Sequence, residues 1–80
     1  MKPKSIVDAC RRHNCCPLVL AARRRNLEVE EYKLNYYVVG PYEAAEALDI
    51  DLDIAAEIAY QYDQGRKMKA ASLAIRAGIL

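Results

Sequence analysis

The residue types best suited to metal or redox chemistry lie in one short stretch of this chain. Cys10, His13, Cys15 and Cys16 combine the side chains that bind zinc with those that form disulfides. Structural zinc sites usually use two ligand pairs separated by a longer loop, and the side chains of adjacent cysteines diverge. The spacing therefore favours small buried apolar residues, with a redox or intermolecular disulfide as the alternative. We predict no metal and no cofactor.

Three aspartates at alternate positions, Asp49, Asp51 and Asp53, resemble the start of a calcium-binding loop. That loop requires a glycine where Ile54 stands and a closing glutamate where Tyr60 stands. Aspartates also favour helix caps and turns, because their side chains bond to nearby backbone groups. We therefore interpret Asp51 as the N-cap of a helix.

The sequence offers little for catalysis. It has one histidine, and its two serines are predicted at a helix cap (Ser5) and on a helix surface (Ser72). No nucleophile–base pair, pair of acids or phosphate-binding glycine loop is evident in the sequence. We predict that the protein is not an enzyme.

Charge is divided sharply along the chain, although the net charge is only +1. Residues 1–25 contain seven basic residues and one acidic residue, a net charge of +6. Residues 43–63 contain seven acidic residues and no Lys or Arg, a net charge of −7. Each segment is suited to an oppositely charged surface.

Both charged segments contain candidate binding residues. The acidic candidates are Glu43, Glu46, Asp53 and Glu57. The basic candidates are Arg11, Arg12, Arg23, Arg24 and Arg25. Solvated arginines at helix ends are the structural alternative for the basic set. The six tyrosines could stack on nucleic-acid bases, but without Phe or Trp they are better suited to the core or an interface.

Residues 41–64 are predicted to form two helices, and we interpret this pair as the element around which the chain is organised. Pro41 suits a first helical position, and Gly65 suits a helix end. A polar line runs along the second helix through Asp53, Glu57, Gln61 and Gln64.

The pair partly resembles the helix-turn-helix motif. Six small or apolar residues fall where that motif places them: Ala44, Ala45, Leu48, Ile50, Ala55 and Ile58. The similarity covers about a quarter of the chain, and Asp49 stands where the motif usually has glycine. Duplex DNA is anionic, and the second helix carries Asp53 and Glu57 but no basic residue. The pattern therefore favours an ordinary helical corner over DNA reading through this helix.

Three more helices are predicted outside the central pair. The first follows Ser5 as N-cap and ends near His13, and the second runs from Pro17 to the arginines 23–25. A last helix covers 66–80, with an apolar surface wide enough to require burial by the fold or by another subunit. Residues 27–39 alternate like a strand, with a phase slip that also permits a helix.

The 80 residues are predicted to form a single small helical domain, a compact bundle of four to five short helices with a possible short β element at 27–39. Such a small core makes a homodimer reasonable. No apolar run is long enough to span a membrane, and three cysteines suit a reducing cytoplasm.

Two functions fit these observations. The first is a regulator or inhibitor that docks its acidic face on a basic surface of another protein. The alternative is a nucleic-acid-binding regulator, helix-turn-helix-like, that uses the N-terminal arginines.

Overall fold

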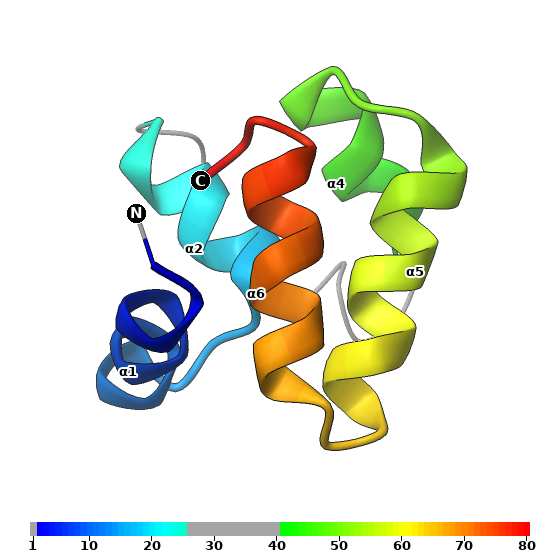
Figure 1. Cartoon of the computed structure of the whole chain (residues 1–80). Coiled ribbons are helices and arrows are strands. Elements are labelled where there is room, and N and C mark those ends of the chain that lie inside the picture. Colours follow the sequence, from blue (N-terminus) through cyan, green and yellow to red (C-terminus); the bar gives the residue numbers. More distant parts are fainter. Residues whose placement is uncertain (1, 26–40) are drawn as a thin grey trace.

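The computed structural model describes residues 2–25 and 41–80, and these ranges are mainly helical (Figure 1). The helices are α1 (Pro3–His13), α2 (Pro17–Arg24), α4 (Pro41–Leu48), α5 (Leu52–Asp63) and α6 (Lys67–Arg76). The described residues contain no strand, and the β element predicted at 27–39 lies outside them. The predicted fold class, a compact bundle of short helices, is thus confirmed for the part of the chain that the structure describes.

Helix α2 is the central helix of this bundle. It packs against α1, α4, α5 and α6, and residues 17–22 are all buried. A helix without a polar side chain on any face over this run is stable only when other helices cover it all round. The 41–64 pair, predicted as the element that organises the chain, shares this central place with α2, because α4 and α5 pack on each other and α5 also packs on α6.

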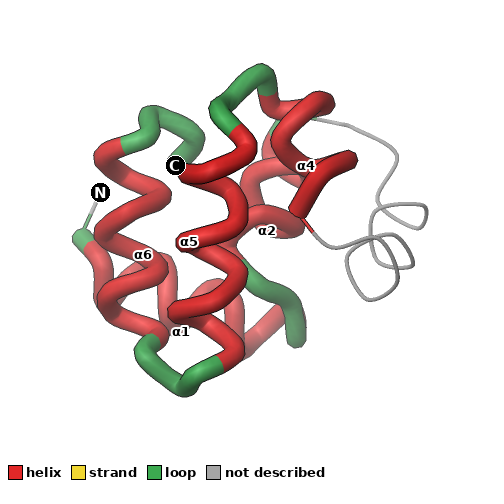
Figure 2. Tube along the Cα trace, turned by 90° about the vertical axis from the view of Figure 1, so that its right-hand side faces the viewer, coloured by secondary structure: helices red, strands yellow, loops and turns green. Residues whose placement is uncertain are grey.

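The other helices surround α2 in an order that their contacts define. Helix α1 packs against α2 and α6, whereas α4 packs against α2 and α5. Helices α5 and α6 lie side by side as a hairpin closed by Gly65 (Figure 1). Turned by 90°, the bundle shows α5 in front and α1 behind (Figure 2). The outer side of α5 therefore faces away from α1.

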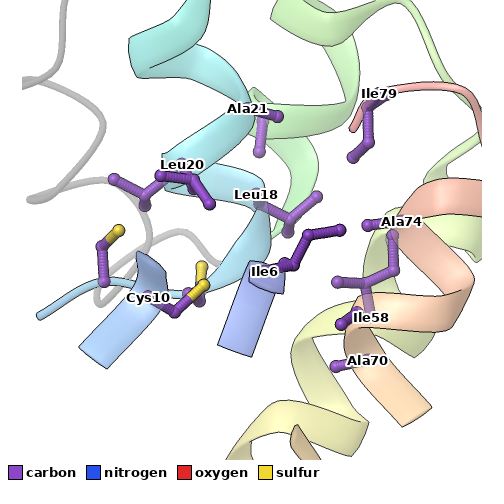
Figure 3. Close-up of a cluster of buried hydrophobic side chains, with 14 of the residues drawn as sticks. Ile6, Cys10, Leu18, Leu20, Ala21, Ile58, Ala70, Ala74 and Ile79 are labelled. Carbon is purple, nitrogen blue, oxygen red and sulfur yellow. The ribbon is translucent and has the colours of Figure 1, made fainter. Parts of the chain in front are cut away.

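The core combines a few large aliphatic side chains with many alanines. Ile6, Leu18 and Ile58 are fully buried and come from α1, α2 and α5 (Figure 3). Helix α6 contributes mainly small residues, because its buried side chains are Ala70, Ala71 and Ala74. Alanine at such positions allows helix backbones to approach closely, which is how a small domain reaches a dense interior.

Four described helices end in the same way, with a residue of positive φ followed by a reversal of the chain. The four residues are Asn14, Asp49, Gly65 and Gly78. At each end the next N–H donates back to the helix, as in Cys15 N–H to Cys10 O (3.1 Å) and Ile50 N–H to Ala45 O (3.0 Å). These are Schellman endings, which satisfy carbonyl groups that a helix end leaves unpaired.

The structure tests three predicted helix boundaries, at Ser5, at the end of the last helix and at Asp51. Ser5 is not an N-cap, because α1 begins two residues earlier with Pro3 at its first position and Lys2 before it. The last helix stops at Arg76 and not at residue 80, because Gly78 turns the chain with φ of 78°. Asp51 does occupy the N-cap of α5, although its side chain makes no capping hydrogen bond.

Candidate docking surface

One face of α5 is exposed along the whole helix and carries acidic and apolar side chains. Asp53, Glu57, Tyr60 and Gln64 are exposed at spacings of four, three and four residues, which places them on one side. Tyr60 is 54% exposed, and Ile54 beside this line is 37% exposed. We call Asp53, Ile54, Glu57 and Tyr60 the α5 surface. It offers two carboxylates and two large apolar groups to a partner.

The four predicted acidic residues are not equally available. Asp53 and Glu57 belong to the α5 surface, and Glu46 is exposed on the neighbouring helix α4. Glu43 is half-buried and already interacts within the chain, so it is less accessible than the other three. The candidate site is therefore centred on α5, with Glu46 exposed on the neighbouring helix and Glu43 less accessible.

Gln61 corrects the predicted polar line of α5, because it is buried with 5% exposure. Its amide nitrogen donates to Glu57 Oε1 at 2.7 Å, and its Oε1 accepts from Arg66 Nη1 at 3.1 Å. The chain thus reverses at Gly65 and returns Arg66 over the end of α5. Gln61 links an acidic to a basic side chain and holds the Glu57 carboxylate at the surface.

The five arginines do not act as one group. Arg23 donates from Nη1 to the carbonyl oxygen of His13 at 3.3 Å, at the end of α1. Arg25 donates to Ile79 O at 2.8 Å and to Gly78 O at 3.4 Å, after the end of α6. These cations bind the negative ends of neighbouring helices. Arg11 and Arg12 are exposed in the last turn of α1. Arg24 is exposed and already interacts within the chain.

The cysteines and the histidine do not form one site. Cys10, Cys15 and Cys16 are buried, whereas His13 is exposed. Within residues 2–25 and 41–80 no group of three or more metal-binding side chains is present. A hydrogen bond with Cys15, and then burial, raise the pKa of the Cys10 thiol, which therefore stays protonated at neutral pH. Burial of all three thiols agrees with their interpretation as small core residues.

Two tyrosines of α5 differ in role. Tyr62 is partly buried, donates its hydroxyl to the Cys15 carbonyl at 3.1 Å, and has Lys67 Nζ 5.6 Å from its ring centroid. It joins α5 to the link between α1 and α2. Tyr60 points to the other side and is exposed. The sequence pattern indicated the buried position of Tyr62 but gave no signal for its partner.

In the described part of the chain, every helix is too short or too polar to cross a membrane. No protein-family model matches this chain, and comparisons with curated proteins and with solved structures gave no match.

Proposed function

We propose that this protein is a small protein-binding module, a regulator or inhibitor without chemistry of its own. It docks the α5 surface on a basic surface of another protein. The observation that supports this most strongly is the α5 surface itself, where Tyr60 and Ile54 stay exposed beside Asp53 and Glu57. Three reduced cysteines suit the cytoplasm, which we propose as its location.

The apolar residues supply the affinity in this proposal. Burying a large apolar side chain lowers the free energy, and tyrosine is enriched among the residues that dominate interface energetics. Tyr60 exposes 54% of its surface on a small domain that has no Phe or Trp to place there. Tyr60 and Ile54 would fill an apolar hollow of the partner.

The carboxylates supply orientation and association rate. Complementary charges steer encounter and disfavour wrong partners more than they add affinity. Asp53 and Glu57 lie one helical turn apart, and no basic residue shares their face of α5. A partner with Lys or Arg side chains around an apolar hollow fits this arrangement.

The arginines are less suited to the principal binding role. Arg23 and Arg25 use guanidinium donors on the carbonyls of His13, Gly78 and Ile79. Binding a phosphate with these groups would remove hydrogen bonds that join the helices. The nucleic-acid alternative therefore rests on Arg11 and Arg12.

Site-specific photo-crosslinking tests the proposal. A photoreactive side chain replaces Tyr60 in cells of the source, and the crosslinked protein is purified and identified. Its affinity is then measured with and without the charge reversals Asp53→Lys and Glu57→Lys. We expect a partner with a basic surface, and at least a tenfold loss of affinity for the double variant. Asp8→Lys is the matched control for each single reversal, because it makes the same charge change on α1 and should change affinity little.

Two further measurements complete the test. Binding to random duplex DNA is followed at low and moderate salt, where phosphate contacts would appear as a steep salt dependence. Micromolar binding that is lost in Arg11→Ala/Arg12→Ala would replace the proposal by the nucleic-acid alternative. Light scattering gives the mass, and a dimer that buries Tyr60 would identify the partner as a second copy.

A further inference from the structure

The corner between α1 and α2 brings two cysteines together. Cys10 lies in the last turn of α1, Asn14 turns the chain with φ of 51°, and Cys15 follows. The Cys15 N–H donates to the Cys10 carbonyl oxygen at 3.1 Å. In a Schellman ending, the side chains of these two positions typically touch.

The backbone geometry limits how far apart the two residues are. With a 3.1 Å bond between N and O, standard bond lengths keep the Cα atoms within roughly 7 Å. Disulfides bridge Cα separations of about 4.4–6.8 Å. The two side chains also interact, since Cys15 is the first cause of the raised pKa of the Cys10 thiol. The corner thus needs little rearrangement to close a bond between them.

Cys16 is placed differently from Cys15. It precedes α2 as N-cap in an extended conformation, with φ of −85° and ψ of 168°. Side chains of successive residues in extended backbone point to opposite sides. Cys15 is therefore the partner of Cys10, and Cys16 is the natural control.

We propose that Cys10 and Cys15 are a redox pair that hydrogen peroxide converts into an intrachain disulfide. Cys15 is the residue that reacts first, because it is 8% exposed and Cys10 only 1%. The thiol of Cys15 loses its proton to solvent, and its sulfur attacks one peroxide oxygen. The O–O bond breaks, which leaves a sulfenic acid on Cys15 and a hydroxide that takes up a proton as water.

The second step uses the neighbouring thiol. The sulfur of Cys10 attacks the sulfur of the Cys15 sulfenic acid, the S–O bond breaks, and the departing hydroxide takes the Cys10 proton as water. In total, two thiols are oxidised and one peroxide is reduced, giving a disulfide and two waters. Because its pKa is raised by the Cys15 hydrogen bond and by burial, Cys10 keeps its proton until Cys15 has reacted.

Peptide mapping of the intact chain tests this directly. Arg11 and Arg12 lie between the two cysteines, so trypsin separates Cys10 from the peptide that contains Cys15 and Cys16. The folded protein is treated with hydrogen peroxide, its remaining thiols are alkylated, and it is digested without reductant. We expect the two peptides to remain linked, with the mass of two hydrogen atoms lost, and to separate on reduction.

The variants assign the bond. Cys16→Ser should retain the linked peptides, and Cys15→Ser should lose them, with folding of each variant checked by circular dichroism. A Cys15–Cys16 bond, a link that persists in Cys15→Ser, linkage only in denaturant, or stable sulfinic acid would each overturn the proposal. If a variant fails to fold, fragmentation of the linked wild-type peptides shows whether Cys15 or Cys16 carries the alkyl group, and alkylated Cys15 would overturn the proposal.

Discussion

Helices α2 and α5 show how two neighbouring helices divide the work of one small domain. Residues 17–22 of α2 are buried on every side, whereas α5 buries Ala55, Ile58 and Ala59 and exposes the opposite face. Of these two helices, only α5 has an exposed face on which a partner could dock. Helix α2 therefore acts on stability alone, whereas α5 has a buried face for stability and an exposed face for binding.

The largest effect is expected in α2. Leu18→Ala leaves a cavity at a fully buried position and should lower the free energy of unfolding by ~2–5 kcal/mol. Ile54→Ala on α5 should change it by less than ~0.5 kcal/mol, because that side chain is partly exposed. Urea denaturation measures both variants. Equal losses would contradict the division between the two helices.

The next effect belongs to α5 and concerns binding. Tyr60→Ala should weaken the complex with the crosslinked partner by about 10–100-fold, because a large exposed side chain is typical of interface residues with dominant energies. Isothermal titration calorimetry measures the affinity. The free energy of unfolding should stay nearly constant, since Tyr60 is 54% exposed. A large loss of stability with unchanged affinity would assign Tyr60 to the fold.

A pH effect on stability is expected from the buried Cys10 thiol of α1. Cys10 belongs to the hydrophobic core, and its pKa is raised, first by the hydrogen bond with Cys15 and then by burial. The unfolded thiol ionises above about pH 8.5 while the folded thiol keeps its proton, so the unfolded state gains stability. The free energy of unfolding should fall by up to ~1.4 kcal/mol per pH unit from this group.

The same pH titration of Cys10→Ala isolates that contribution. Every other ionisable group is common to both proteins. Stability curves measured by urea denaturation between about pH 8 and pH 10.5 should be less steep for the variant. Parallel curves would show that the Cys10 thiol ionises equally in both states.

The smallest effect concerns the end of α2. Arg25→Ala removes two hydrogen bonds to carbonyl groups, at 2.8 Å and 3.4 Å, and should cost about 0.5–1.5 kcal/mol. For a domain of this size, each kcal/mol lowers Tm by roughly 4–8 °C. Arg12→Ala, an exposed arginine of α1, is the control and should leave Tm almost unchanged. Equal shifts would show that Arg25 contributes only charge.

Local patterns in the sequence predicted much of the fold. Periodic small residues located α4 and α5, and Gly65 located the end of α5. The central position of α2 could have been recognised as well, because residues 17–22 have no polar face. Asp49 adopts a φ of 55°, so the turn between α4 and α5 has the conformation for which the helix-turn-helix motif usually uses glycine.

The candidate site was harder to predict, because its details depend on residues brought together by tertiary structure. Helical periodicity placed Gln61 on the exposed side, but Arg66 returns after the Gly65 reversal and takes part in burying it. The partners of Arg23 and Arg25 lie ten and more than fifty residues away along the chain. Neither composition nor spacing encodes such pairs, so the sequence did not separate Arg23 and Arg25 from the other basic candidates.

The hydrogen bonds from Arg25 also affect how this domain opens. They join residues 54 and 53 positions apart, and so they exist only after α2 and α6 have docked. The Ile79 amide, bonded to Ala74 O at 3.2 Å, lies in the turn that they hold. Its hydrogen exchange should therefore be slower than that of a freely fraying end, and Arg25→Ala should speed it up.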